Sequence, residues 1–233
     1  MARAQATGFG MSDAVNRREL KWVHRPLQAR SRETLERILT ATEAMLTERD
    51  FGSISVSEIA LAGGSSVGAF YARFKDKEGL LHLIHERFCE EALATIQDAL
   101  DPKRWEGIEL TVLLDALVTF MVQTYRERAG LLRAFLLYGC VHEDFQKREQ
   151  RLSNQLNACL SQVMASRLGE IQHPRPDTAV VFGLQMMLST LQAKYVVSKT
   201  PEAGSNEAVS VLIYELSRAY RGYLGLGVGT PEV

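Results

Sequence analysis

The chain has 233 residues, of which 46% are apolar and 24% are charged, and its formal net charge is −1 at pH 7. This length suits two domains, the composition is ordinary for a soluble globular protein, and the balanced charge gives no overall sign of a nucleic-acid partner. Three widely spaced cysteines, an odd number, argue against a disulfide framework and favour a reducing compartment.

The first expected segment is a basic N-terminal arm over residues 1–29. Residues 14–32 hold six lysines and arginines against one glutamate, whereas residues 1–13 contain no apolar run, so no signal peptide is expected. A basic block of this kind usually marks a solvated arm. Beside a DNA-reading helix it marks a phosphate or groove contact.

Two helices and a tight turn are predicted next. Apolar residues recur at three-and-four spacing over residues 31–49, and Ser31 is placed to cap that helix. Ser55-Val56-Ser57-Glu58 has the form of a capping box that opens a second helix, which Gly63 and Gly64 end.

A third helix is predicted over residues 66–74, and Asp76 is placed to cap a fourth that runs to about residue 99. A short helix, a glycine turn and a second short helix form a helix-turn-helix, whose second helix can enter the major groove, about 12 Å wide. Gly68 weakens that second helix by roughly 1 kcal/mol relative to alanine. Its presence therefore suggests that the helix backbone approaches DNA closely.

The rest of the chain also reads as helices, and no strand pattern of any length occurs. The run over 178–193 is the longest without charge; its 16 residues include two glutamines, which makes it too short and too polar for a membrane span. No membrane association and a cytoplasmic location are expected. The predicted fold is all-α with about nine helices, the later ones near residues 108–125, 130–141, 144–169, 177–198 and 207–225.

A spaced pattern of apolar, glycine and aromatic residues runs through the helix-turn-helix region: Ile38-Leu39-x-Ala41, Phe51, Ser55-Val56-x-x-Ile59-Ala60, Gly64-x-Ser66-x-Gly68-x-Phe70-Tyr71-x-x-Phe74 and Lys75-x-Lys77-Glu78-x-Leu80. The pattern resembles the DNA-binding domain of the tetracycline-repressor (TetR) family of transcriptional regulators, over about residues 30–82. The sequence departs from the family's usual residues at Asp50, Gly63 and Ser65.

The resemblance implies a three-helix helix-turn-helix domain over residues 30–76 and a helical ligand-binding and dimerisation domain over 77–228. It also implies roles for single residues in binding double-stranded operator DNA. Facing the base edges would be Val67, Gly68 and Ala69; packing on the backbone or contacting phosphates would be Ser31, Arg32, Ser57, Ser66, Tyr71, Arg73 and Lys77.

The residues expected to face the bases carry no side-chain hydrogen-bonding groups, so bidentate reading of guanine or adenine is not available at those positions. Specificity is therefore expected to depend on thymine-methyl contacts, DNA shape and the basic arm. One such unit reads only a few base pairs, so a homodimer is expected on a palindromic operator. The apolar helices near 177–198 and 207–225 are the candidates for its interface; filling the core of the monomer is the alternative.

The C-terminal bundle is expected to bind a small apolar or weakly polar organic effector of unknown identity, because methionines and aromatic residues suit adaptable pockets. The same residues at helical spacing are also typical of an ordinary core. The candidate lining comprises Phe120, Met121, Tyr125, Phe135, Tyr138, Met164, Phe182, Met186 and Tyr195.

Two groups of polar residues offer metal-ligating side chains at short spacing. They are His82, His85, Glu86 and Cys89, and Cys140, His142, Glu143 and Asp144. A polar flank beside the core is the favoured interpretation, and neither a metal nor another cofactor is expected. Two functional classes remain: a ligand-responsive, non-enzymatic regulator, expected to be a repressor, and a helical small-molecule or metal enzyme with an incidental basic N-terminus.

Overall fold

The computed structural model describes residues 29–198 and 206–227. Within these ranges the protein consists of nine α-helices without any β-strand, which confirms the all-α prediction. The helices are α1 (Ala29–Glu48), α2 (Val56–Ala62), α3 (Val67–Tyr71), α4 (Lys77–Ala99), α5 (Leu110–Glu127), α6 (Ala129–Gly139), α7 (Glu143–Met164), α8 (Pro176–Leu191) and α9 (Asn206–Tyr223). Short 3-10 turns lie at Phe51–Ser53 (η2), Pro102–Trp105 (η3) and Ala165–Glu170 (η4), and a π-helical segment, Gln192–Val197 (η5), continues α8.

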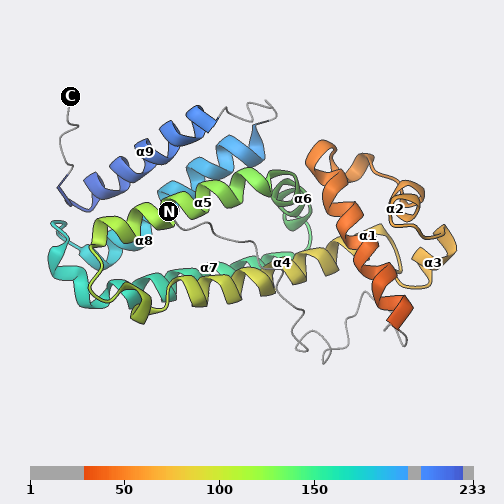
Figure 1. Ribbon diagram of the computed structural model, residues 1–233, viewed down its shortest axis with the longest axis horizontal. Helices are drawn as coiled ribbons and strands as arrows, with labels where there is room; N and C mark the ends of the chain where they lie inside the picture. The colour runs from red at the N-terminus through yellow and green to blue at the C-terminus, as the bar shows by residue number, and fades with distance from the viewer. Residues whose placement is uncertain (1–28, 199–205, 228–233) are drawn as a thin grey trace, which may run out of the picture.

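Figure 1 shows α1, α2 and α3 grouped at one end of an elongated molecule. Helices α4 and α7 run side by side along its length, while α5, α8 and α9 form a second layer. Helix α6 stands between this body and α1, and it contacts both.

The buried apolar residues form two clusters. One joins α1–α3 and the start of α4 to α6 and to Phe145 of α7, and the other fills the space between α5, α7, α8 and α9. Helix α4 contributes to both clusters, because Leu80, Leu81 and Ile84 belong to the first and Ile96 to the second. A movement of α4 would therefore change the packing of both clusters.

Helix α6 joins the two parts through close contacts on both of its sides. Its Gly130 packs directly on α1, where a β-carbon would come 1.8 Å from the carbonyl oxygen of Leu46. Tyr138 lies edge-on to Phe51, with 5.2 Å between ring centroids. On the other side, Arg133 donates to the carbonyl oxygen of Val196 at 2.9 Å, at the end of the π-helical segment.

The continuation of α8 into η5 gives a helical stretch longer than the uncharged run in the sequence. Residues Pro176–Val197 form 22 helical residues, and an 18-residue window of this stretch has a mean hydropathy of 1.2, which by length and composition is enough to cross a membrane. The interior helix of a folded domain has the same properties, and α8 buries Val180, Leu184 and Leu191 against the rest of the bundle.

A polar cluster lies between α4 and α7, formed by two histidines and one arginine. Arg148 Nε donates to His85 Nδ1 at 2.9 Å, and a terminal nitrogen of the same guanidinium lies 3.1 Å from His82 Nδ1. Since a guanidinium only donates, both Nδ1 atoms accept, and each neutral ring carries its hydrogen on Nε2. The Nε2 atom of His85 lies 2.8 Å from Glu149 Oε1 and donates to it.

This geometry bears on the first candidate metal group. His85, Cys89 and Glu149 place their ligand atoms within 4.8 Å of one another, and Glu149 was not part of the sequence prediction. A metal on His85 Nε2 would require the ring hydrogen to move to Nδ1, where it would face the N–H of Arg148. The hydrogen bonds therefore assign these side chains to packing between α4 and α7.

Because His82 and His85 are buried, we expect the stability of the fold to decrease in acid. Burial lowers the pKa of His82 to about 4 and also lowers the pKa of His85. In the unfolded chain each histidine has a pKa near 6.5, so the unfolded state binds more protons as pH falls below that value. For His82 alone, the free energy of unfolding should decrease by about 2 kcal/mol between pH 7.5 and pH 5.

Urea unfolding at a series of pH values measures this effect, with His82→Asn as the comparison that removes the titrating group. The wild type should lose stability more steeply than the variant between pH 7 and pH 5. Equal slopes for the two proteins would contradict the assignment of the acid sensitivity to His82.

Candidate nucleic-acid interface

Helix α2 is fixed by the capping box predicted from the sequence. Ser55 Oγ accepts from the Glu58 backbone N–H at 3.2 Å, and the Glu58 carboxylate accepts from the Ser55 N–H at 2.7 Å. The helix ends at Ala62, and Gly64 then adopts φ +60°, a left-handed conformation that favours glycine. These contacts confirm the predicted start and end of α2.

Close packing of α2 on α1 explains the glycine at position 63. A β-carbon there would lie 2.8 Å from Cγ1 of Ile38 and 3.1 Å from its Cα, so α2 sits directly against α1. Arg37 of α1 adds a hydrogen bond from Nε to the Gly63 carbonyl oxygen at 3.1 Å. Sequence spacing could not show this contact, because it joins residues 26 positions apart.

Helix α3 is shorter than the predicted 66–74 and comprises only Val67–Tyr71. Ser66 is its N-cap, with Oγ accepting from the Ala69 N–H at 3.1 Å. Phe70 is fully buried, whereas 39% of Val67 and 51% of Tyr71 are exposed. The helix thus exposes Val67 and Tyr71, while Phe70 is its single buried residue.

Gly68 occupies open space on this helix. The nearest atom to a β-carbon at this position would be Ser66 Oγ at 3.9 Å, and the backbone does not adopt a left-handed conformation. The fold itself therefore gives no reason for glycine here.

The remaining predicted DNA contacts are placed as follows. Helix α1 begins at Ala29, so Ser31 lies inside the helix; the prediction that it is the N-cap is wrong, because the helix starts two residues earlier. Arg32 and Ser57 are exposed, and Arg73 is half-buried. Lys77 is the first residue of α4, after the predicted N-cap Asp76, whose Oδ1 accepts from the Gly79 N–H at 2.7 Å.

Ser65 carries a buried hydroxyl oxygen that has no hydrogen-bond partner among residues 29–198 and 206–227. A buried hydroxyl without a partner costs about 1 kcal/mol or more. We expect Ser65→Ala to raise the free energy of unfolding by about 1 kcal/mol in a urea titration. A lower stability for the variant would mean that the hydroxyl has a partner in solution.

The structure does not bring the nine candidate effector residues into one cavity. Phe135 is buried in the N-terminal cluster and Tyr138 packs against it, while Met121, Met164 and Tyr195 are buried in the C-terminal cluster and Tyr125 packs on it. The other three, Phe120, Phe182 and Met186, are exposed.

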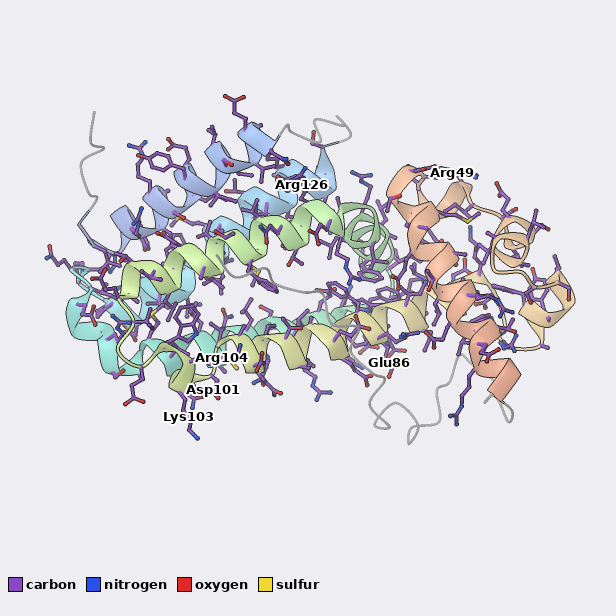
Figure 2. The ribbon with its side chains drawn as sticks, in the orientation of Figure 1. Arg49, Glu86, Asp101, Lys103, Arg104 and Arg126 are labelled. Atoms are coloured by element: carbon purple, nitrogen blue, oxygen red, sulfur yellow. The ribbon has the colours of Figure 1, made fainter. Side chains whose placement is uncertain are left out.

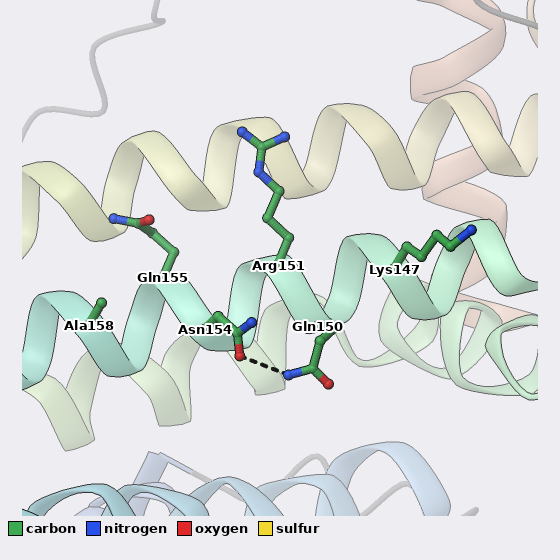
Figure 3. Close-up of a pocket in the computed structure, with 6 residues that line it drawn as sticks. All are labelled: Lys147, Gln150, Arg151, Asn154, Gln155 and Ala158. Atoms are coloured by element: carbon green, nitrogen blue, oxygen red, sulfur yellow. Dashed lines mark hydrogen bonds between the residues drawn. The ribbon is translucent and has the colours of Figure 1, made fainter.

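Two surface hollows are lined by residues that are not among the nine candidate effector residues. One of about 530 Å³ lies along α7 and is lined by Lys147, Gln150, Arg151, Asn154, Gln155 and Ala158. Arg151 and Gln155 point toward α4, and Gln150 donates to Asn154 at 2.8 Å (Figure 3). The other, of about 300 Å³, lies beside the start of α4 and includes His142, Glu143 and Asp144 from the second candidate metal group.

Comparison with known proteins supports the helix-turn-helix assignment. The family model of bacterial regulatory proteins of the tetR family matches residues 38–84. An uncharacterised HTH-type transcriptional regulator of Mycobacterium tuberculosis is 34% identical over 93 residues, 38% of this chain and 46% of the relative. The HTH-type regulator AcrR of Shigella flexneri is 30% identical over 117 residues, 50% of this chain and 54% of AcrR.

Solved structures share the fold over most of the chain. A TetR-family transcriptional regulator from Mesorhizobium loti aligns with a TM-score of 0.65 and 18% identity, covering 84% of this chain and 98% of that one. GusR of Salmonella enterica aligns with a TM-score of 0.59 and 21% identity, covering 82% and 95%.

These matches indicate a helix-turn-helix domain joined to a helical C-terminal body. Residues 38–84 match the family of bacterial regulatory proteins named tetR. The matched stretch spans about half the length of the curated relatives.

Proposed function

We propose that this protein is a non-enzymatic, ligand-responsive transcriptional regulator of the cytoplasm that binds double-stranded operator DNA through α2 and α3. The observation that carries the proposal is the outward face of α3. Val67 and Tyr71 are exposed beside Gly68, whose lack of a side chain the fold does not require. A helix with an apolar face and an unobstructed backbone fits the major groove, where thymine methyl groups offer apolar contacts.

We also propose that the protein binds as a homodimer, through α8 and α9, to a palindromic site. Helix α8 buries one side against the bundle, yet 47% of Phe182 and 39% of Met186 remain exposed. Exposed aromatic and methionine side chains are enriched at protein interfaces. Two copies of this face would form a four-helix contact and place two copies of α3 on one face of the duplex.

The proposed effector is a small organic molecule that binds within the C-terminal body, and the proposed regulatory sign is repression. Helix α4 offers a physical route for the response, because it belongs to both apolar clusters. An effector that binds one arrangement of α4 more tightly would shift the population of DNA-binding-competent dimers.

Selection from fragmented genomic DNA of the source organism tests the proposed function. Purified protein should enrich a few fragments that share an inverted repeat, and a footprint on them should show two protected half-sites. Enrichment no greater than that of a random fragment pool would contradict sequence-specific DNA binding.

A further inference from the structure

Lys77 has an ammonium group that the protein itself surrounds. Its Nζ donates to the carbonyl oxygens of Phe51 and Ile54, both at 2.8 Å, and the carbonyl oxygen of Gly52 lies at 3.5 Å. The same Nζ lies 4.5 Å from the centroid of the Phe51 ring. An ammonium has three N–H donors, so these carbonyl groups account for all of them.

These contacts hold a particular piece of the fold in place. The Phe51 carbonyl oxygen also accepts from the Ile54 N–H at 3.2 Å, so Lys77 adds a second donor to a carbonyl of η2 and ties the turn and Ile54 to α4. The turn leads directly into Ser55, the N-cap of α2, so Lys77 fixes the start of α2 against the start of α4. Burial in this setting lowers the pKa of Lys77.

Two further cations of the domain are engaged in the same way. Arg37 donates to the Gly63 carbonyl oxygen. Arg49 pairs with Glu58 at 2.6 Å and donates to the Ser53 carbonyl oxygen at 2.6 Å. Arg37 therefore joins α1 to the end of α2, and Arg49, directly after α1, joins η2 and the start of α2.

Lys75 differs from these side chains. It is exposed and makes no hydrogen bond or ion pair with any residue in the described parts of the chain. It lies between the end of α3 and Asp76, the N-cap of α4, four residues after Tyr71. Its charge is thus placed at the rim of the proposed DNA-binding face.

We infer that Lys75 supplies the phosphate contact at the junction of α3 and α4, while Lys77 is a positioning residue that holds η2 and α2. This inference rests on the proposed DNA binding. To reach a phosphate, the Lys77 ammonium would have to leave carbonyl groups that are partly buried with it, which costs their hydrogen bonds. Lys75 would exchange only water for the phosphate oxygen.

The test uses a duplex that the full-length protein has selected from genomic DNA, with fluorescence anisotropy at four or more salt concentrations and urea unfolding of each variant. Lys75→Ala should reduce the salt slope by about one and weaken binding several-fold on selected and unrelated duplexes alike, with an unchanged urea midpoint. Lys77→Met should lower the urea midpoint and leave the salt slope unchanged.

Lys103→Ala is the matched control, because Figure 2 shows Lys103 at the opposite end of the molecule from Arg49. It should change neither quantity. The inference is overturned if Lys77→Met lowers the salt slope by about one at an unchanged midpoint, or if Lys75→Ala leaves the slope as it is.

If Lys77→Met does not fold, Lys77→Arg keeps the charge while changing the fit to the three carbonyl groups. It should lower the urea midpoint and keep the salt slope. A wild-type protein that binds no fragment refutes the proposed function instead, and the urea midpoints of the Lys77 variants still decide the positioning role.

Discussion

Gly130→Ala should destabilise the protein by about 3 kcal/mol, the upper range for overpacking of a tight contact. The added β-carbon would lie 1.8 Å from the Leu46 carbonyl oxygen and 2.6 Å from its carbonyl carbon. Both are backbone atoms of α1, so no side-chain rotation can relieve the overlap. Helix α6 would have to move away from α1, which opens the cluster that holds the helix-turn-helix to the body. Urea unfolding of wild type and variant measures the difference.

Gly139→Ala, at the other end of α6, is the control. It shows what a glycine-to-alanine substitution does in this helix where no close contact is present. Its β-carbon would meet Phe145 Cβ at 3.8 Å, an ordinary van der Waals distance. Alanine is favoured over glycine in a helix, so this control should be neutral or slightly stabilising. Similar stabilities for the two variants would show that α6 and α1 are not in close contact in solution.

Gly68→Ala should weaken DNA binding without lowering the stability of the fold. The position is open within the protein, and alanine favours the helix by up to about 1 kcal/mol, so the variant should be as stable as wild type or more so. A methyl group on the face of α3 that enters the groove should instead weaken binding about tenfold or more, because overpacking a tight contact costs 1–3 kcal/mol. Urea unfolding and anisotropy on a selected duplex measure the two effects.

Gly169→Ala is the control for this variant, since a β-carbon there also has open space around it and it lies in η4, outside the helix-turn-helix. It should bind DNA as tightly as wild type. Unchanged affinity for Gly68→Ala would show that the α3 backbone does not approach the duplex closely, and the proposed docking of α3 would have to be abandoned.

Local signals in the sequence predicted the bounds of α2 and the start of α4. The reciprocal hydrogen bonds of Ser55 and Glu58, the left-handed Gly64 and the cap at Asp76 all depend on residues within four positions of one another. Such contacts are set by the local chain and can be read from spacing. The start of α1 differs from the prediction, because the helix begins at Ala29 and includes Ser31.

Contacts between distant residues could not be predicted in this way. The partners of Lys77 lie 23 to 26 positions earlier in the chain, and those of Arg148 lie 63 and 66 positions away. The candidate effector residues lie apart for a related reason, since Phe135 and Tyr195 are both buried but pack into different clusters. Apolar spacing identifies buried faces and does not identify which faces meet.

Recognition of DNA through α3 can be tested by titrating the purified protein and its Tyr71→Ala variant against duplex DNA from its own upstream region, at two salt concentrations. Tyr71 is exposed on α3 with its ring edge-on to the buried Phe70, so its removal should leave the fold intact. We expect tight, salt-sensitive binding by wild type and at least tenfold weaker binding by the variant. Equal affinity of the two proteins, or equal affinity of wild type for a scrambled duplex, would contradict recognition of DNA through α3.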